Sequence, residues 1–155
     1  MKLTLEVLSE DGSVLRKIDS TDKSKLKTWT GGPAKPPTLP AKPGLNRFHW
    51  DLRTDPLPGV RNIFLMGGHA GSRVVPGTYT LRLSTDQEGL EPVETSAIVS
   101  ADPRVKGTEA DYLAQQQALN KIRDLASNVH LSVVQFRRVK SQLAGRLALL
   151  KEMDG

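Results

Sequence analysis

Residues 74–84, "VVPGTYTLRLS", carry the clearest structural signal in this chain of 155 residues. Pro76-Gly77 is typical of a turn, and the residues that follow it alternate between apolar and polar. In a strand, this alternation places Tyr79, Leu81 and Leu83 on the inward face. The stretch therefore predicts a half-buried β-strand that begins directly after a turn.

Two further segments with the same alternation open the chain. Residues 3–8 and 14–18 flank the sequence "SEDGS", in which Asp11-Gly12 favours a tight turn because glycine tolerates a positive φ. This pattern predicts a β-hairpin at the amino terminus. Residues 93–99 follow the pattern less strictly, because Ile98 breaks the alternation, and we expect them to form the last strand.

The segment 44–60, "GLNRFHWDLRTDPLPGV", raises the question of a site. His49 and Asp51 stand beside Trp50, but alternation over residues 46–52 places them on the face opposite the rings. No nucleophile lies nearby in the sequence, so we interpret the segment as a core strand with a polar outer face. The predicted core residues are Phe48, Trp50, Leu52, Tyr79 and Leu81.

Residues 63–66 add one more short apolar strand, which brings the expected total to six. Short strands at regular spacing predict a β-sandwich of the immunoglobulin or fibronectin type III kind over residues 1–102. Residues 20–44 are rich in proline and lysine, which favours an extended surface loop. Trp29 in this loop is either a cap laid over the sandwich edge, the interpretation we favour, or an exposed ligand contact.

After Asp102-Pro103 the periodicity becomes helical, so we assign residues 103–155 to a helical tail. Thr108 is the expected N-cap, with acidic residues in the first turn. Steps of four and three residues then form an apolar heptad stripe, with Ser132 as its one polar member. Such a stripe needs a partner helix, unless the helix breaks near Ser127-Asn128 into a hairpin. The predicted association face is Ile122, Leu125, Val129, Phe136, Val139, Leu143 and Leu147.

No constellation in the sequence points to catalysis, a cofactor or a metal ion. The chain has no cysteine, and its three histidines stand far apart at positions 49, 69 and 130. The glycine-rich stretch "GGHAGSRVVPG" lacks the Gly-Lys-Ser/Thr of a phosphate-binding loop, and Ser72 is not in a nucleophile elbow. We expect His69 to be a mobile loop residue.

The net charge of +5 is unevenly distributed. Residues 1–102 carry 13 basic and 12 acidic residues, whereas residues 103–155 carry 9 and 5. An excess of four over the tail is more typical of a solvated helix face than of a nucleic-acid site, so binding through the basic residues is disfavoured. No apolar run is long enough to cross a bilayer, and the amino terminus does not match a signal peptide. The basic residues in question are Lys121, Arg123, Arg137, Arg138 and Lys140.

Three stretches together resemble a bacterial protein family: "GLNRFHWDLR", "VPGTYTLRL", and "ADPR" before "YLAQQQALNKIRDL". The family comprises large exported sortilin-like or glycosyl hydrolase-like proteins with BNR (Asp-box) repeats, also called exo-α-sialidase-like. In these proteins a β-propeller is followed by a carboxy-terminal sandwich and helices. The resemblance implies that this chain is the accessory carboxy-terminal module. No Asp-box pattern occurs here, so no catalytic residue is carried over.

These observations lead to one main expectation and one alternative. The first is a non-catalytic structural or interaction module that docks against a propeller or self-associates through its helix. The alternative is a carbohydrate-binding module that uses Trp29, with Arg61 and His69 as further loop contacts. The family resemblance implies a periplasmic or extracellular location.

Overall fold

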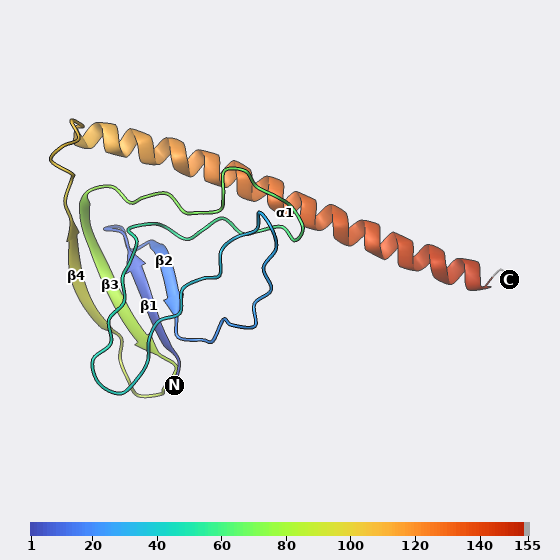
Figure 1. Ribbon diagram of the computed structural model, residues 1–155, viewed down its shortest axis with the longest axis horizontal. Helices are drawn as coiled ribbons and strands as arrows, with labels where there is room; N and C mark the ends of the chain where they lie inside the picture. Colours follow the sequence, from blue (N-terminus) through green and yellow to red (C-terminus); the bar gives the residue numbers. More distant parts are fainter. Residues whose placement is uncertain (154–155) are drawn as a thin grey trace.

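The chain begins with the predicted β-hairpin, in a computed structural model that describes residues 1–153. Strands β1 (Leu3–Leu8) and β2 (Val14–Asp19) pair antiparallel, and Gly12 adopts a φ of 82° in the turn between them. Strand β3 (Gly77–Thr85) pairs with the other edge of β1, and β4 (Val93–Val99) pairs with β3. The result is one antiparallel sheet in the order β2-β1-β3-β4 (Figure 1).

One face of the sheet carries a ladder of alternating charges. Lys17 Nζ lies 2.9 Å from Glu6 Oε1, and Arg82 lies between Glu6 and Glu94, at 3.7 and 2.6 Å. The four residues are opposite one another in the strand register. This arrangement is typical of an antiparallel sheet with one face toward water.

The other face holds the core, and the layer that covers it is made of loops. Val7 and Tyr79 are buried there with Val74, and Trp50 packs against them. The Trp50 and Tyr79 rings meet edge to face, with their centroids 5.8 Å apart and their planes at 72°. This geometry is the one that aromatic pairs prefer. The second layer therefore comes from the long connection between β2 and β3, residues 20–76.

Residues 46–52 do not form the predicted strand. Leu52 has a φ of 55°, and the Asp51 side chain accepts a hydrogen bond from the Arg53 amide at 3.2 Å. The Trp50 indole donates to the Arg53 carbonyl at 2.9 Å. Both bonds engage the backbone of Arg53 and fix a local turn at the end of the segment. Phe48 and Trp50 are half-buried as expected, but Leu52 is 38% exposed and does not belong to the core.

Residues 63–66 are also not a strand. The Ile63 amide donates to the Val60 carbonyl and the Gly68 amide to the Leu65 carbonyl, which are turn contacts. Asn62 has a φ of 60° just before the segment, and Met66 is 91% exposed. The apolar composition alone predicted a strand here, but the segment does not pair with the four-stranded sheet.

The loop layer is pinned to β2 by a few specific bonds. The buried Arg16 guanidinium donates to the Thr54 carbonyl at 3.0 Å, and the Asp55 amide donates to the Leu15 carbonyl at 2.8 Å. Gly71 approaches Thr54 so closely that a Cβ would lie 2.1 Å from the Thr54 carbonyl oxygen. The glycine-rich stretch therefore lets two loop segments pack together.

Residues 1–153 thus contain a single four-stranded antiparallel sheet followed by one helix. The expected combination of sheet and helical tail is present. With residues 46–52 and 63–66 in loops, the immunoglobulin or fibronectin type III kind of sandwich is not confirmed.

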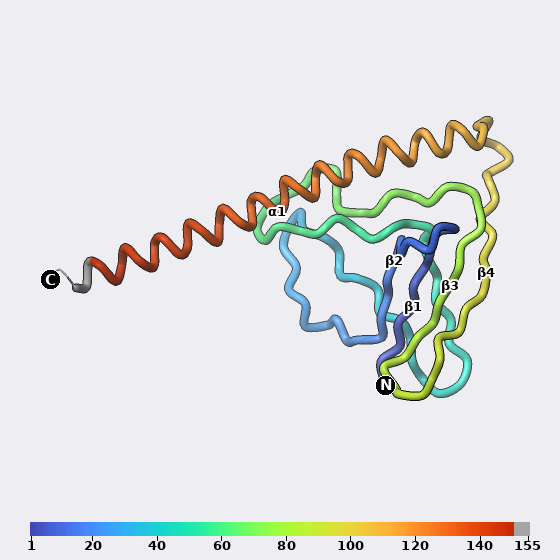
Figure 2. Tube along the Cα trace, turned by 180° about the vertical axis from the view of Figure 1, so that it is seen from behind, coloured from blue at the N-terminus to red at the C-terminus, as the bar shows by residue number. Residues whose placement is uncertain are grey.

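Helix α1 (Glu109–Met153) is continuous for 45 residues, so the hairpin alternative near residue 127 is wrong. Thr108 caps it as predicted: its hydroxyl accepts from the Asp111 amide at 3.2 Å, and Asp111 Oδ2 accepts from the Thr108 amide at 2.8 Å. This reciprocal pair stabilises the helix start. The helix crosses one end of the two layers, and its carboxy-terminal part extends far past them (Figures 1 and 2).

The β1–β2 turn should respond to acid through Asp11. The Ser9 hydroxyl and the Ser13 amide hold the pKa of Asp11 down at about 2, against an ordinary value of 3.8. A lowered folded-state pKa stabilises the fold above pH ~4, and this contribution is lost as the pH falls through about 2. Urea unfolding should show Asp11→Ala to be less stable than the parent at pH 6, with a smaller difference at pH 2.5. Glu10→Ala, exposed in the same turn, is the control; an equal effect of both substitutions would contradict this role for Asp11.

Removing the Trp50 ring should separate the loop layer from the sheet. Trp50→Ala loses the contact with Tyr79 and the bond to Arg53, and we expect a loss of about 3 kcal/mol in the free energy of unfolding. Trp50→Phe keeps an aromatic ring and loses the indole donor, which should cost about 1 kcal/mol. The neighbouring exposed His49→Ala is the matched control. Denaturant titration followed by circular dichroism measures the loss in unfolding free energy, which should be largest for Trp50→Ala, smaller for Trp50→Phe and smallest for His49→Ala. Equal losses for Trp50→Ala and His49→Ala would contradict this role for Trp50.

Candidate functional site

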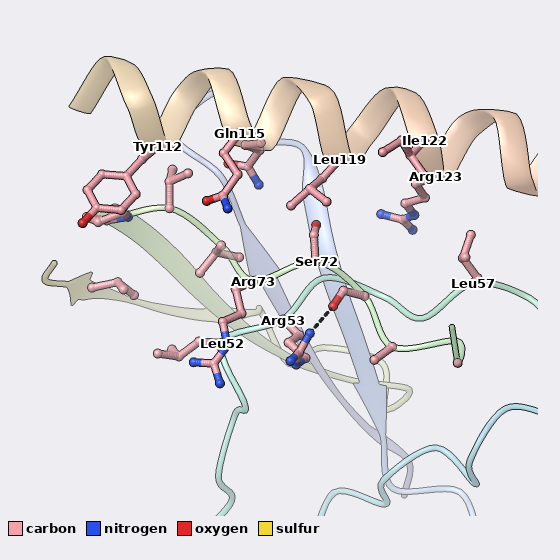
Figure 3. A pocket seen from close by; sticks show the side chains of 18 of the residues that line it. Leu52, Arg53, Leu57, Ser72, Arg73, Tyr112, Gln115, Leu119, Ile122 and Arg123 are labelled. Carbon is pink, nitrogen blue, oxygen red and sulfur yellow. Dashed lines mark hydrogen bonds between the residues drawn. The ribbon is translucent and has the colours of Figure 1, made fainter. Parts of the chain in front are cut away.

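A cavity of about 900 Å³ lies between α1 and the loop layer (Figure 3). Tyr112, Leu119 and Ile122 reach into it from the helix, and the loops contribute apolar side chains such as Leu57 and Val74. A helix rises about 1.5 Å per residue, so the cavity follows α1 for roughly 20 Å from Tyr112 to Ala126. Its volume and its mainly apolar wall are typical of a small-molecule site.

Positive charge predominates among the residues that line this cavity. Three arginines take part, Arg53, Arg73 and Arg123, against one acid, Asp102. Asp102 is already paired with Arg104, at 2.7 Å. Arg53 donates to the Gly71 carbonyl at 2.7 Å, whereas the exposed Arg73 and the half-buried Arg123 have no side-chain hydrogen-bond or ion-pair partner among residues 1–153. The cavity thus joins an apolar wall to a cation that is free to bind a ligand.

Helix α1 contacts the body through loops. His130 Nδ1 donates to the Pro58 carbonyl at 2.8 Å, and Arg137 donates to the Arg61 carbonyl. We call the helix side that faces the loops the docked face; its least exposed members recur at helical spacing. They are Tyr112, Gln116, Arg123, Ala126, Ser127, His130 and Val133.

His69 is not the mobile loop residue that the sequence predicted. It is 6% exposed and lies against His130 on the docked face, with the two ring centroids 6.1 Å apart. Its Nδ1 has no hydrogen-bond partner among residues 1–153. Burial, and secondarily the nearby His130, lower the pKa of His69. A charged imidazole is therefore disfavoured at this contact.

The predicted association face lies elsewhere on the helix and is open to solvent. Its side chains are between 52 and 76% exposed. Ile122, Val129 and Phe136 each come one position before a residue that faces the loops. One position corresponds to a rotation of about 100° around the helix axis. We call this set the apolar stripe: Ile122, Leu125, Val129, Phe136, Val139, Leu143 and Leu147.

Trp29 lies between two loop segments. Its indole donates to the Ile63 carbonyl at 3.0 Å, and a Cβ on Gly32 or Gly59 would collide with its ring. The residue is half-buried. The ring is thus packed between loop segments, and both the cap over a sandwich edge and the exposed ligand contact stay predictions.

No hydrogen bond joins the side chains of His49 and Asp51 in the structure of residues 1–153. His49 is exposed, and Asp51 is engaged by the Arg53 amide. Within residues 1–153, no three or more histidine, cysteine, aspartate or glutamate side chains are placed to hold a metal ion. The same residues include no helix long and apolar enough to cross a membrane.

Sequence reasoning found the apolar stripe but missed the cavity and the buried histidines. The docked face repeats every three or four residues as the stripe does, but polar residues such as Gln116, Arg123 and His130 occupy it. Hydrophobic periodicity therefore gives no signal for it. Only the path of the loops over the helix brings His69 to His130.

Stability should fall in mild acid because of His69. Since its folded-state pKa is lowered, its neutral form stabilises the fold fully above the ordinary value of 6.5, and this contribution is lost as the pH falls below it. The free energy of unfolding should therefore be lower at pH 5.5 than at pH 7.5. His69→Gln should flatten this dependence, and the exposed His49→Gln should not. An unchanged slope in His69→Gln, measured by urea titration, would show that the dependence has another source.

Comparison of the chain with family models, with curated proteins and with solved structures finds no match in any of the three.

Proposed function

We propose that this chain is a non-catalytic structural and protein-interaction module that self-associates through the apolar stripe of α1. The observation that carries the proposal is the exposure of the stripe on an unbroken helix. Phe136 is 76% exposed and Leu143 57%, and beyond the contact of Arg137 with Arg61 the helix extends past the loops (Figure 2). Large apolar side chains aligned in this way mark an interaction surface.

The spacing of the stripe fits a second helix. Ile122, Val129, Phe136 and Leu143 follow at intervals of seven, as in the a positions of a coiled coil. Ser132 falls among the intervening residues, and its hydroxyl donates to the Asn128 carbonyl at 2.9 Å. This bond satisfies the one polar group within the stripe, so it can be covered without leaving a donor unpaired.

The apolar area is large enough for association. Full burial of one such side chain stabilises by about 1.5–3 kcal/mol, so burial of the exposed half contributes about 1 kcal/mol. Seven side chains from each of two copies contribute roughly 14 kcal/mol, against an association cost of about 4–15 kcal/mol. The gain exceeds all but the upper end of this cost, so the stripe carries enough apolar area for two copies to associate.

The immunoglobulin-type fold and the relationship to exported propeller proteins are part of the same proposal. Tyr79 donates its hydroxyl to the Val75 carbonyl at 2.6 Å, across the turn at Pro76-Gly77. A tyrosine that bonds back to the chain a few residues upstream is a feature of immunoglobulin-type sandwiches. This contact supports a relationship to that class, and with it the resemblance to the sandwich-plus-helix module of exported propeller proteins. In such a parent protein, the propeller would carry any glycosidase activity.

Charge on the stripe should abolish association without unfolding the module. Phe136→Glu places a carboxylate at the centre of the stripe, on a side chain that contacts little else. We expect the parent chain to be dimeric at low micromolar concentration, and Phe136→Glu to be monomeric with an unchanged circular dichroism spectrum. Sedimentation equilibrium across a dilution series measures both masses.

Leu131→Glu is the matched control. Leu131 is 59% exposed on the same helix but lies on neither the apolar stripe nor the docked face. It should leave the dimer intact. A parent chain that stays monomeric up to about 100 µM, or equal loss of association in both variants, would contradict self-association through the stripe.

A further inference from the structure

We propose that the cavity between α1 and the loop layer binds a small amphiphilic anion, an apolar chain or ring that ends in a carboxylate or similar group. The site is separate from the surface proposed for association, because it opens between the docked face and the loops. Ile122, at the boundary, takes part in both.

The apolar part of the ligand follows from the wall of the cavity. Leu119 on α1 and Leu57 on the loops line the cavity (Figure 3), and Val74 is a further apolar residue of its wall. Val74 belongs to the buried core, which gives the floor of the cavity a fixed position. An apolar group placed there would remove these side chains from water, at about 25 cal/mol per Å².

The charge of the ligand follows from Arg123. Its side chain extends from the helix toward the segment that carries Ser72 (Figure 3). The residue is half-buried and has no partner among residues 1–153, and the acid that lines the cavity, Asp102, is held by Arg104. A guanidinium binds a carboxylate in a forked, two-bond geometry. Ser72 and Gln115 add neutral polar groups beside it.

A larger occupant is less well matched. A second helix needs an interaxial distance of 8–10 Å, which would displace α1 from the His130–Pro58 contact. Nucleic acid would require several exposed cations, whereas the cavity is mainly apolar and Arg53 is already bonded to Gly71. A small molecule with one negative group can pair with Arg123 and cover the apolar wall.

Decanoate and 1-decanol, which share a chain and differ in charge, test the proposal in the full-length chain. Amide chemical shifts in a ¹H–¹⁵N titration give both the affinity and the location. Decanoate should bind at least tenfold more tightly than decanol and should shift the amides of Ser72, Leu119 and Arg123. Phe136→Glu serves as the common background, so that helix association does not compete.

Variants separate the two parts of the recognition. Arg123→Gln should weaken decanoate binding about tenfold and leave decanol unchanged, since a hydrogen bond to a charged group is lost. Leu119→Gln should weaken both ligands. The controls are Arg138→Gln and Leu131→Gln, exposed on α1 away from the cavity.

Three outcomes would overturn the proposal. They are equal affinity for the acid and the alcohol, equal effects of Arg123→Gln and Arg138→Gln, and shifts confined to residues 134–150. The last two would show that decanoate binds the basic free part of the helix. None of these results bears on the dimer, because the mass of the parent chain is measured without ligand.

Discussion

The edge-to-face contact between Trp50 and Tyr79 is the interaction on which the rest of the body depends. A single sheet of four short strands has one face toward water and must cover the other. Here the cover is made of loop segments, which are joined to each other by an antiparallel bridge between Arg53 and Arg73 and by flanking backbone hydrogen bonds. Trp50 supplies the apolar area, and its indole bond to Arg53 fixes the turn that brings Thr54 and Asp55 to β2. Arg16 then completes the attachment from the sheet side.

Tyr79 serves both layers at once. Its ring lies in the core, while its hydroxyl closes the turn before β3 through the Val75 carbonyl. Burial raises the pKa of this phenol, so the hydroxyl stays protonated and remains a donor. Val74, one residue before that carbonyl, is both part of the core and part of the cavity floor. The position of the cavity is therefore tied to the same contact that holds the layers together.

The sequence predicted the local elements well where local chemistry determines them. The Asp11-Gly12 turn, the strand after Pro76-Gly77 and the Thr108 cap each depend on residues within four positions of one another, and all three are present. Residues 46–52 and 63–66 failed for a different reason. Alternation and apolar composition do not show whether a segment will find a neighbouring strand, and neither segment belongs to the four-stranded sheet. The loop layer is fixed by bonds between distant residues, such as Arg16 to Thr54, which no sequence pattern records.

The two sides of α1 explain why the candidate site was harder to predict than the apolar stripe. A stripe with a strict repeat of seven residues is visible because apolar side chains alone compose it. The docked face includes arginine, glutamine and histidine because it faces loops, whose carbonyl groups need donors. His130 and Arg137 meet that need through Pro58 and Arg61. A mixed face of this kind reads as solvent-exposed in any pattern of hydrophobicity.

The cavity itself follows from the stiffness of the helix. Near its start, α1 is joined to β4 by residues 100–108, which end in the Thr108 cap. The next hydrogen bond between α1 and the loops is at His130, roughly 30 Å along the axis. A helix without proline bends only gently over this distance, so α1 cannot curve toward Ser72 and fill the cavity. Protein interiors are otherwise close-packed, and a gap of this size beneath a rigid span persists only if water or a ligand fills it. Because its wall is mainly apolar and both Arg73 and Arg123 lack partners among residues 1–153, an amphiphilic anion fills it better than water does.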